Sequence, residues 1–165
     1  MVQVTEPGKF VAHTTKLKEG QDAPYFEGKN EKGELIKLTD FKQQKLLLYF
    51  YPKDSTPTCT DEACSLRDDF SELSKAGISV LGVSADTEKS HLKFSKKYGL
   101  PFSLIADTEL QMIQAYDVWG QKMLFGRIYD GLVRTSFLID ENGLIRNIIR
   151  AVDSKAHAQQ ILSLI

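Results

Sequence analysis

The chain has 165 residues, of which 42% are hydrophobic, and a formal net charge of −1 at pH 7. This length and composition are typical of one domain with a sizeable core, so we predict a single domain over residues 1–165 with a loose N-terminal arm over 1–16. The balanced charge and the lack of a basic amphipathic helix argue against a nucleic-acid partner and against a membrane surface.

The N-terminal half predicts, in chain order, a small β-hairpin (25–30 and 34–38), a strand (45–51) and a helix (57–76). The strand is a continuous apolar run, which is typical of a central strand buried on both faces. The helix repeats its apolar side chains at helical spacing and ends at Gly77, a residue type that suits a helix stop.

The C-terminal half alternates strands and helices and ends with a hairpin around Asn142-Gly143, a strong turn signal. We expect a strand at 78–84, a helix capped by Asp86 and ending at Tyr98, a strand at 102–105, a short helix at 110–116, strands at 134–139 and 144–151, and a last helix capped by Asp153 or Ser154. This alternation predicts an α/β fold of three layers, with a central mixed sheet and helices on both faces.

The start of the predicted helix places a cysteine where its anion is favoured. Thr56 is a good N-cap residue and Pro57 suits the first helical position. Cys59 therefore lies at about the third helical residue, where free backbone N–H groups and the helix dipole stabilise a thiolate. Sites in such sheets gather where a strand ends and a helix begins, so Cys59 is a candidate nucleophile.

The second cysteine, Cys64, lies five residues further along the same helix. At ~100° per residue its side chain points roughly 140° away from that of Cys59, and the two Cα atoms lie roughly 8 to 9 Å apart. A disulfide tolerates at most about 7 Å. If these cysteines ever join, the first turns of the helix must unwind.

Pro52, Thr56 and Cys59 resemble the P-x-x-x-T-x-x-C motif of peroxiredoxins, and Cys64 matches the second cysteine of the PrxQ or bacterioferritin comigratory protein subfamily. The resemblance extends from about Leu17 to the C-terminus, through the segments YFYPKDSTPTCTDEACSLRDDF, LGVSAD, YGLPF and RTSFLID. At one position, Thr58, the subfamily usually has glycine. The resemblance implies a thioredoxin-like fold and a thiol-dependent peroxidase that needs no cofactor or metal.

By this resemblance, Cys59 attacks hydrogen peroxide or an organic hydroperoxide, and Cys64 resolves the resulting sulfenic acid as an intramolecular disulfide. Thr56 would hydrogen-bond the peroxide, and Pro52 would shield the thiolate. Arg134 would be the active-site arginine.

The resemblance also assigns Glu62 to a family glutamate that helps to organise this arginine. It further implies a thioredoxin-type protein as reductant and a monomer, and it leaves a weak dimer open. Residues 1–24 contain no apolar signal-peptide core, and no stretch approaches the ~18 apolar residues of a membrane span, so we expect a cytoplasmic soluble protein.

Other interpretations of the same residues remain open at this stage. Cys59 would also suit an inert core position, and an arginine that opens a strand, as Arg134 does, is usually solvated. A general thiol–disulfide oxidoreductase could use both cysteines, but such enzymes carry Cys-x-x-Cys, which closes within one helical turn. A redox sensor or chaperone could use the same unwinding to expose a partner surface. Turnover of hydroperoxide would separate these classes.

Overall fold

The computed structural model describes residues 10–165, so residues 1–9 of the predicted arm lie outside the described part. The remainder of the arm is held by hydrogen bonds to distant residues. The His13 N–H donates to the Gln121 carbonyl oxygen at 3.0 Å, and the Thr15 hydroxyl donates to the Tyr116 carbonyl oxygen at 2.7 Å. These contacts align residues 13–15 with the segment that follows α4 (Gln111–Ala115).

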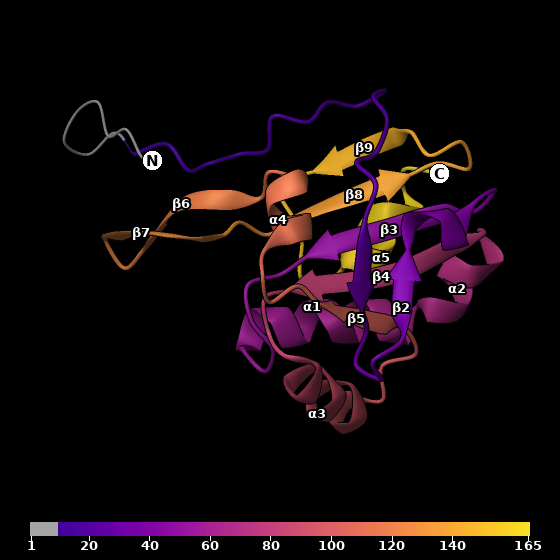
Figure 1. Cartoon of the computed structure of the whole chain (residues 1–165), viewed down its shortest axis with the longest axis horizontal. Coiled ribbons are helices and arrows are strands. Elements are labelled where there is room, and N and C mark those ends of the chain that lie inside the picture. The colour runs from indigo at the N-terminus through magenta and orange to yellow at the C-terminus, as the bar shows by residue number, and fades with distance from the viewer. Residues whose placement is uncertain (1–9) are drawn as a thin grey trace.

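A five-stranded mixed sheet forms the centre of the molecule (Figure 1). Its strands, in spatial order, are β5 (Ser103–Ala106), β4 (Ile78–Ser84), β3 (Lys45–Phe50), β8 (Thr135–Ile139) and β9 (Ile145–Ile149). The pairs β3/β4 and β4/β5 are parallel, whereas β3/β8 and β8/β9 are antiparallel. The predicted central mixed sheet is thus confirmed.

Both faces of β3 are buried, as its continuous apolar sequence predicts. Leu47 and Tyr49 face one hydrophobic cluster, and Leu46 and Leu48 face the other. The first cluster includes side chains of α1 (Pro57–Asp68), α2 (Phe70–Lys75), α3 (Glu88–Tyr98) and α5 (His157–Leu162). Two faces covered by separate layers give the expected three-layer arrangement.

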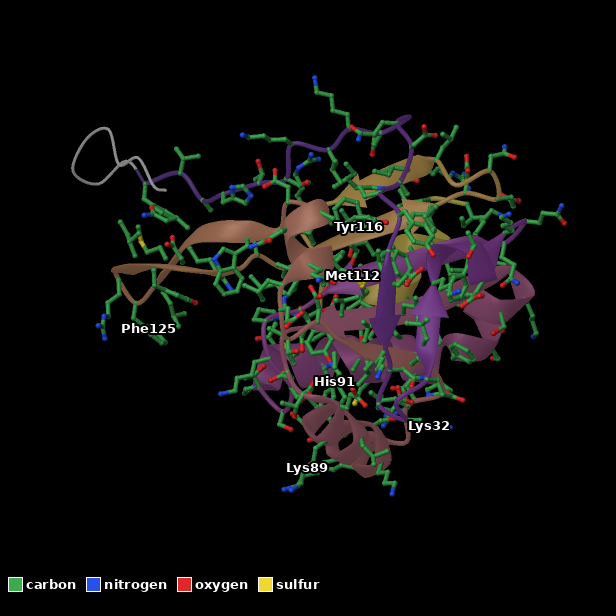
Figure 2. All side chains as sticks on the ribbon, viewed as in Figure 1. Lys32, Lys89, His91, Met112, Tyr116 and Phe125 are labelled. Carbon is green, nitrogen blue, oxygen red and sulfur yellow. The ribbon has the colours of Figure 1, made fainter. Side chains whose placement is uncertain are left out.

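The second cluster is completed by α4 and by the region of the N-terminal hairpin. Met112 and Tyr116, both labelled in Figure 2, belong to it together with Phe26. The hairpin consists of β1 (Glu27–Lys29) and β2 (Leu35–Lys37), which are shorter than predicted, and a 3-10 helix η1 (Leu38–Phe41) follows.

Three predicted helix details are wrong. The helix expected over 57–76 is divided at Asp69, whose φ of −107° and ψ of 20° separate α1 from α2, because aspartate is a weak helix former. Thr87 rather than Asp86 caps α3, since the Asp86 carboxylate accepts hydrogen bonds elsewhere. The N-cap of α5 is Ala156 rather than Asp153 or Ser154.

A second hairpin, formed by β6 (Trp119–Leu124) and β7 (Arg127–Leu132), was not predicted from the sequence. It projects from the body of the molecule, and Phe125 at its tip is 95% exposed (Figures 1 and 2). Phe125 and Gly126 in the turn have φ values of 50° and 74°. Hairpin turns with two positive φ angles usually contain Asn-Gly, whereas this turn has a phenylalanine at the first position. Within residues 10–165, no helix combines the length and the apolar character needed to cross a membrane.

Candidate active site

Cys59 lies where β3 ends and α1 begins. Pro57 occupies the first helical position, as predicted, and the Cys59 side chain faces the core with 1% of its surface exposed. Ala63 and Leu66 share this face of α1 and are also buried. The helical spacing of apolar residues therefore holds the sulfur at the helix N-terminus, where the dipole favours negative charge.

Arg134 meets Cys59 because of the pairing of β8 with β3. The two strands are antiparallel, with Phe50 opposite Thr135, so the residue before β8 lies beside the end of β3. The Arg134 guanidinium donates from Nη2 to the Cys59 sulfur at 3.1 Å. The arginine predicted from the resemblance is thus in direct contact with the predicted nucleophile, and a thiolate beside it has a fixed positive partner.

Glu62 lies one turn beyond Cys59 and forms an ion pair with Arg134, through Nη1 and Oε1. Its side chain is fully buried, and burial raises the pKa of this carboxyl to about 7, against the opposing effect of Arg134. The guanidinium therefore has two neighbours, a sulfur and a carboxyl, that both compete for its charge. Glu62 orients the fork that Arg134 presents to Cys59.

Cys64 lies in the third turn of α1 and is half-buried, and both cysteines are free. Burial raises the pKa of its thiol, partly offset by Arg67. Because α1 is intact from Pro57 to Asp68, the two sulfurs point in different directions around the helix axis. The structure therefore shows a reduced state in which Cys59 contacts Arg134 and the two cysteines are unbridged.

Thr56 occupies the predicted N-cap position with an extended backbone, but its hydroxyl does not cap the helix. Instead it donates to the Lys53 carbonyl oxygen at 2.8 Å, which closes a tight turn before α1. Pro52 lies half-buried between the end of β3 and this turn. Both residues therefore belong to the segment that leads into Cys59.

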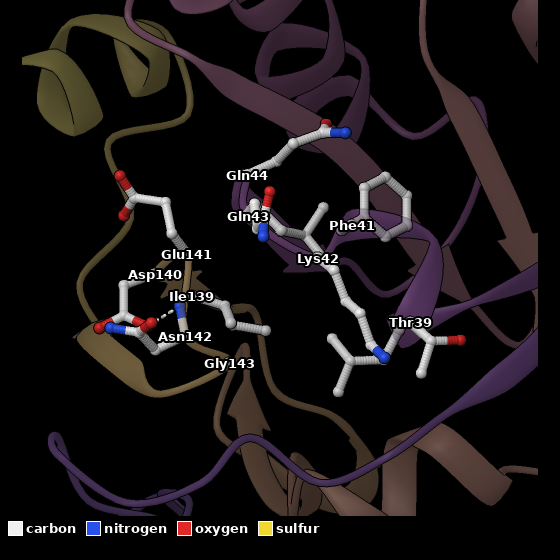
Figure 3. A pocket seen from close by; sticks show the side chains of 12 residues that line it. Thr39, Phe41, Lys42, Gln43, Gln44, Ile139, Asp140, Glu141, Asn142 and Gly143 are labelled. Carbon is white, nitrogen blue, oxygen red and sulfur yellow. Dashed lines mark hydrogen bonds between the residues drawn. The ribbon is translucent and has the colours of Figure 1, made fainter.

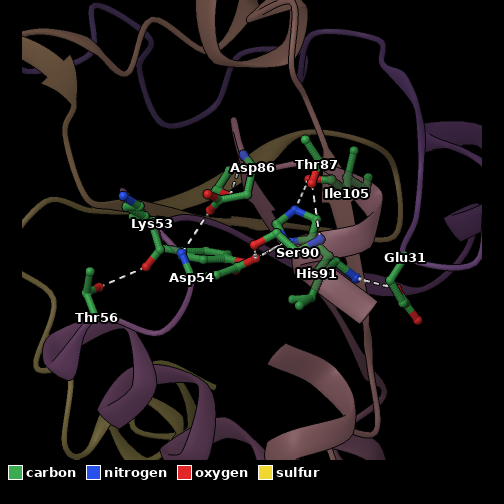
Figure 4. Close-up of polar contacts among 12 residues, drawn as sticks. Glu31, Lys53, Asp54, Thr56, Asp86, Thr87, Ser90, His91 and Ile105 are labelled. Atoms are coloured by element: carbon green, nitrogen blue, oxygen red, sulfur yellow. Dashed lines mark hydrogen bonds and ion pairs between the residues drawn. The ribbon is translucent and has the colours of Figure 1, made fainter. Parts of the chain in front are cut away.

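A buried polar cluster anchors this segment (Figure 4). Asp54 accepts from Tyr51 at 2.6 Å and from Ser90 at 2.8 Å, and it lies 2.7 Å from His91 Nδ1. Its own N–H donates to Asp86 at 2.8 Å. Oxygen and nitrogen atoms of Asp54, Asp86 and His91 lie within 4.8 Å of one another, a spacing that could hold a metal ion.

The histidine of this cluster, however, has both nitrogens engaged. His91 Nε2 faces the Ile105 carbonyl oxygen at 2.9 Å and must donate to it, while Nδ1 and Asp54 share a proton. Neither nitrogen offers a lone pair to a metal. We therefore interpret the cluster as a hydrogen-bonded anchor that joins the 52–56 segment to α3 and β5.

Sequence reasoning missed two polar residues near Cys59. His157 is fully buried on α5, with Nε2 3.6 Å from the Glu62 carboxyl and 2.8 Å from the Ser136 hydroxyl. Lys122, on β6, donates to the Leu132 carbonyl oxygen at 2.6 Å, and burial and the charge of Arg134 lower its pKa. Both residues reach the site through strand and helix packing, which leaves no local signal in the sequence.

Two aromatic residues, Tyr49 and Trp119, differ in exposure. Tyr49 is fully buried on β3, and burial raises the pKa of its hydroxyl well above the ordinary value. Trp119, at the start of β6, is 39% exposed. Tyr49 is therefore part of the core behind the site, whereas Trp119 lies on the surface.

A cavity of about 360 Å³ lies at the opposite end of the sheet from Cys59 (Figure 3). It is lined by residues 38–39 and 41–44, which precede β3, by Leu46 of β3, and by residues 139–143 at the turn between β8 and β9. Because Cys59 follows the other end of β3, this cavity is separate from the cysteine site.

Residues 20–148 match the family model described as the AhpC/TSA family. Peroxiredoxin Bcp of Escherichia coli (strain K12) is 43% identical over 147 residues, which cover 89% of this chain and 94% of that protein. Peroxiredoxin Bcp of Bacillus subtilis (strain 168) is 43% identical over 143 residues, which cover 87% and 91%.

Solved structures of similar fold come from the same group of proteins. Peroxiredoxin Q of Xanthomonas campestris superposes with a TM-score of 0.81 at 33% identity, covering 91% of this chain and 95% of that one. A PrxQ mutant of Xylella fastidiosa superposes with a TM-score of 0.84 at 30% identity, covering 92% and 96%. A third structure, at 33% identity and a TM-score of 0.81, concerns the alkyl peroxide reduction activity of the Xanthomonas campestris bacterioferritin comigratory protein.

Proposed function

Because this chain belongs to the AhpC/TSA family and is a thiol-dependent peroxidase of the peroxiredoxin type, we propose that Cys59 is the residue that attacks the peroxide. The observation that carries this assignment is the 3.1 Å contact between Arg134 Nη2 and the Cys59 sulfur. A thiolate in that position forms a bond to one peroxide oxygen as the O–O bond breaks, and the other oxygen leaves as hydroxide or alkoxide. The sulfur is oxidised to sulfenic acid and the peroxide is reduced to water or an alcohol.

Arg134 and the start of α1 stabilise the charge that develops on the leaving oxygen. The guanidinium is always positive and presents a planar fork, one arm of which is held by Glu62. By the family resemblance, Thr56 would contact the peroxide through its hydroxyl, which donates to the Lys53 carbonyl oxygen in the structure, and Pro52 would shield the thiolate. Both residues lie in the segment before Cys59, which is compatible with these roles.

Cys64 resolves the sulfenic acid in this proposal. Its thiol attacks the oxidised Cys59 sulfur, so that an S–S bond forms as the S–O bond of the sulfenic acid breaks. The hydroxyl leaves as water with the proton of the Cys64 thiol. A helix places Cα atoms five residues apart at roughly 8 to 9 Å, beyond the reach of about 7 Å of a disulfide. The first turns of α1 must therefore open before the bond forms.

The finer points of the proposal concern partners and location. A thioredoxin-type protein would reduce the disulfide, since an exposed or strained disulfide is an accessible target for thiol exchange. Organic as well as hydrogen peroxide would be substrates, in line with the alkyl peroxide activity named for the Xanthomonas relative. We further propose a single-domain monomer that works in the cytoplasm.

The test is peroxide consumption coupled through thioredoxin and its reductase to NADPH oxidation, with hydrogen peroxide and an alkyl hydroperoxide measured separately. Cys59→Ser should abolish consumption. Cys64→Ser, the matched control at the other cysteine, should consume one equivalent per chain and then stop, because the sulfenic acid persists. Continued turnover by Cys59→Ser would overturn the assignment of the nucleophile.

A further inference from the structure

Behind Arg134 lies a fully buried acid–base pair, Glu62 and His157, whose protonation the proposed chemistry does not use. The side chains of Glu62 and His157 both have an exposed fraction of 0%, and Oε2 of the acid lies 3.6 Å from Nε2 of the imidazole. Among residues 10–165, Glu62 Oε2 has no hydrogen-bond partner. A carboxylate oxygen buried without a donor is costly, whereas a protonated oxygen in the same position is not charged.

The proton on His157 can be located from its neighbours. Gln160 donates from Nε2 to the Ala151 carbonyl oxygen at 2.9 Å, and its Oε1 accepts from the Asp153 N–H at 3.0 Å, so the orientation of the amide is determined. Oε1 also lies 2.9 Å from His157 Nδ1. Because an amide oxygen only accepts, Nδ1 carries the proton.

The other imidazole nitrogen therefore faces Glu62 with a lone pair. Burial lowers the pKa of His157 to about 4, so the ring is neutral at pH 7 and Nε2 is an acceptor. The Ser136 hydroxyl, 2.8 Å away, donates to the same nitrogen and occupies its single lone pair. Neither group therefore offers a hydrogen to an ionised Glu62, whereas a protonated Oε2 carries no charge that needs a donor.

The groups that face Glu62 come from every packed element around it. Arg134 before β8 is its charged neighbour, the Cys59 sulfur on the same helix contacts the same guanidinium, and His157 approaches from α5. Tyr49 on β3 contributes a hydroxyl whose pKa is raised well above the ordinary value by burial, so it stays neutral. Arg134 is thus the one cation that Glu62 and Cys59 share among these groups.

We propose that Glu62 is protonated at neutral pH, because its buried Oε2 faces the unprotonated nitrogen of His157 rather than a donor, and that the loss of this proton controls how much positive charge Arg134 presents to the Cys59 sulfur. When Glu62 is neutral, the guanidinium charge acts on the thiolate and on the leaving oxygen. When Glu62 gives its proton to solvent, the carboxylate neutralises part of that charge. His157 is accordingly a positioning residue for the peroxidase reaction.

The inference rests on the proposed role of Cys59, but its first test needs no peroxide. In reduced protein labelled with ¹³C at glutamate carboxyl groups and with ¹⁵N in histidine, the Glu62 signal is identified by its loss in Glu62→Gln. We expect this carboxyl to titrate near pH 7, in line with its buried position, and His157 to show the Nδ1–H tautomer. Titration of Glu62 near 4.5, the ordinary value, or a proton on His157 Nε2 at neutral pH would overturn the proposal.

The second test uses His157→Gln, which puts an amide N–H where His157 has its lone pair. This donor stabilises the carboxylate, so the Glu62 titration should move down by about one pH unit. The single-turnover rate with hydrogen peroxide should fall by about tenfold as Glu62 ionises, which is less than the loss of a whole donor. This step in the pH–rate profile should shift to lower pH together with the Glu62 titration. Glu62→Gln should remove the step.

His91→Gln is the matched control, because His91 is equally buried and lies in a different cluster. It should cost stability without moving the step. A rate step that stays at the parent pH in His157→Gln would show a purely structural histidine and would overturn the proposal. If His157→Gln does not fold, the carboxyl titration in the parent still decides. A protein that reduces peroxide but whose Glu62 has an ordinary pKa would refute the inference about Glu62 and His157 alone. A protein whose Glu62 pKa is raised but which does not react with peroxide would refute the proposed function.

Discussion

Replacing Asp54 with asparagine should loosen the segment that carries the start of the active site. The Asp54 carboxylate holds three side chains, those of Tyr51, Ser90 and His91, at 2.6, 2.8 and 2.7 Å, and it is buried. Asparagine has nearly the same volume but no negative charge. Asparagine therefore cannot supply the negative charge that accepts from the Tyr51 and Ser90 hydroxyls and faces His91 Nδ1.

The size of the effect follows from the burial of the pair. The side chains of Asp54 and His91 are 3% and 0% exposed, and each hydrogen bond to a charged group contributes about 1.5 to 3 kcal/mol. Asparagine keeps one acceptor oxygen, so we expect two of the three contacts to be lost, at a cost of about 3 kcal/mol. If residues 52–58 open without global unfolding, this energy makes their opening about 100-fold more frequent, at about 1.4 kcal/mol per factor of ten.

Urea unfolding and amide hydrogen exchange of the reduced protein measure the two effects separately. Asp107→Asn is the control, because Asp107 is also buried but accepts from one backbone N–H, that of Ile113 at 2.8 Å. The control should lose about 1 kcal/mol and should leave exchange across residues 52–58 unchanged. An Asp54→Asn protein as stable as the control, with unchanged exchange across that segment, would refute the anchor role of the cluster.

Three further predictions concern the site itself. Joining Cys59 to Cys64 should remove amide protection across residues 56–64 after peroxide treatment, and unchanged exchange in protein that has lost both free thiols would contradict the unwinding. Arg134→Lys keeps the charge but loses the fork to Cys59 and Glu62, so single-turnover sulfenate formation should slow by at least about tenfold; a rate within about twofold of the parent would exclude Arg134 as the catalytic arginine. Between about pH 4.5 and 6.5, the unfolded parent carries one proton of this pair on His157, and the folded parent carries one on Glu62. Because the number of bound protons does not change on folding, the pair adds little pH dependence to the stability of the parent in this range. In Glu62→Gln, His157 is the one group of the pair that still titrates, and its pKa is lowered by folding. The free energy of unfolding of this variant, relative to the parent, should therefore fall by up to about 3 kcal/mol as the pH drops from 6.5 to 4. Urea unfolding measures this difference, and a difference that does not change with pH would contradict the prediction.

Much of the fold could be predicted from the sequence because its signals are local. The continuous apolar run at 45–50 predicts a strand buried on both faces, and Leu46 and Leu47 indeed face opposite clusters. Thr56-Pro57 marks a helix start, and helical spacing turns Cys59 toward the core. The proposed nucleophile and its helix N-terminus could be predicted from about ten consecutive residues.

Helix boundaries and the hairpin β6–β7 were less predictable. Asp69 interrupts a pattern that is helical on both sides, and Thr87 competes with Asp86 for the same cap. The turn at Phe125-Gly126 has one glycine and a bulky residue in the left-handed region. Packing and competing hydrogen bonds determine helix boundaries and turn residues of this kind. A single sequence does not show which of two competing hydrogen-bond partners is used.

The electrostatics of the site were decided by tertiary structure alone. Arg134 is 75 residues from Cys59 in sequence and reaches it because β8 pairs antiparallel with β3. His157 reaches Glu62 because α5 packs on α1, and nothing in either helix predicts the other. Charges act over a few ångströms in a buried site, so the protonation of a side chain depends on which distant segments the fold brings beside it, whereas the thiolate-favouring position of Cys59 depends on its own helix.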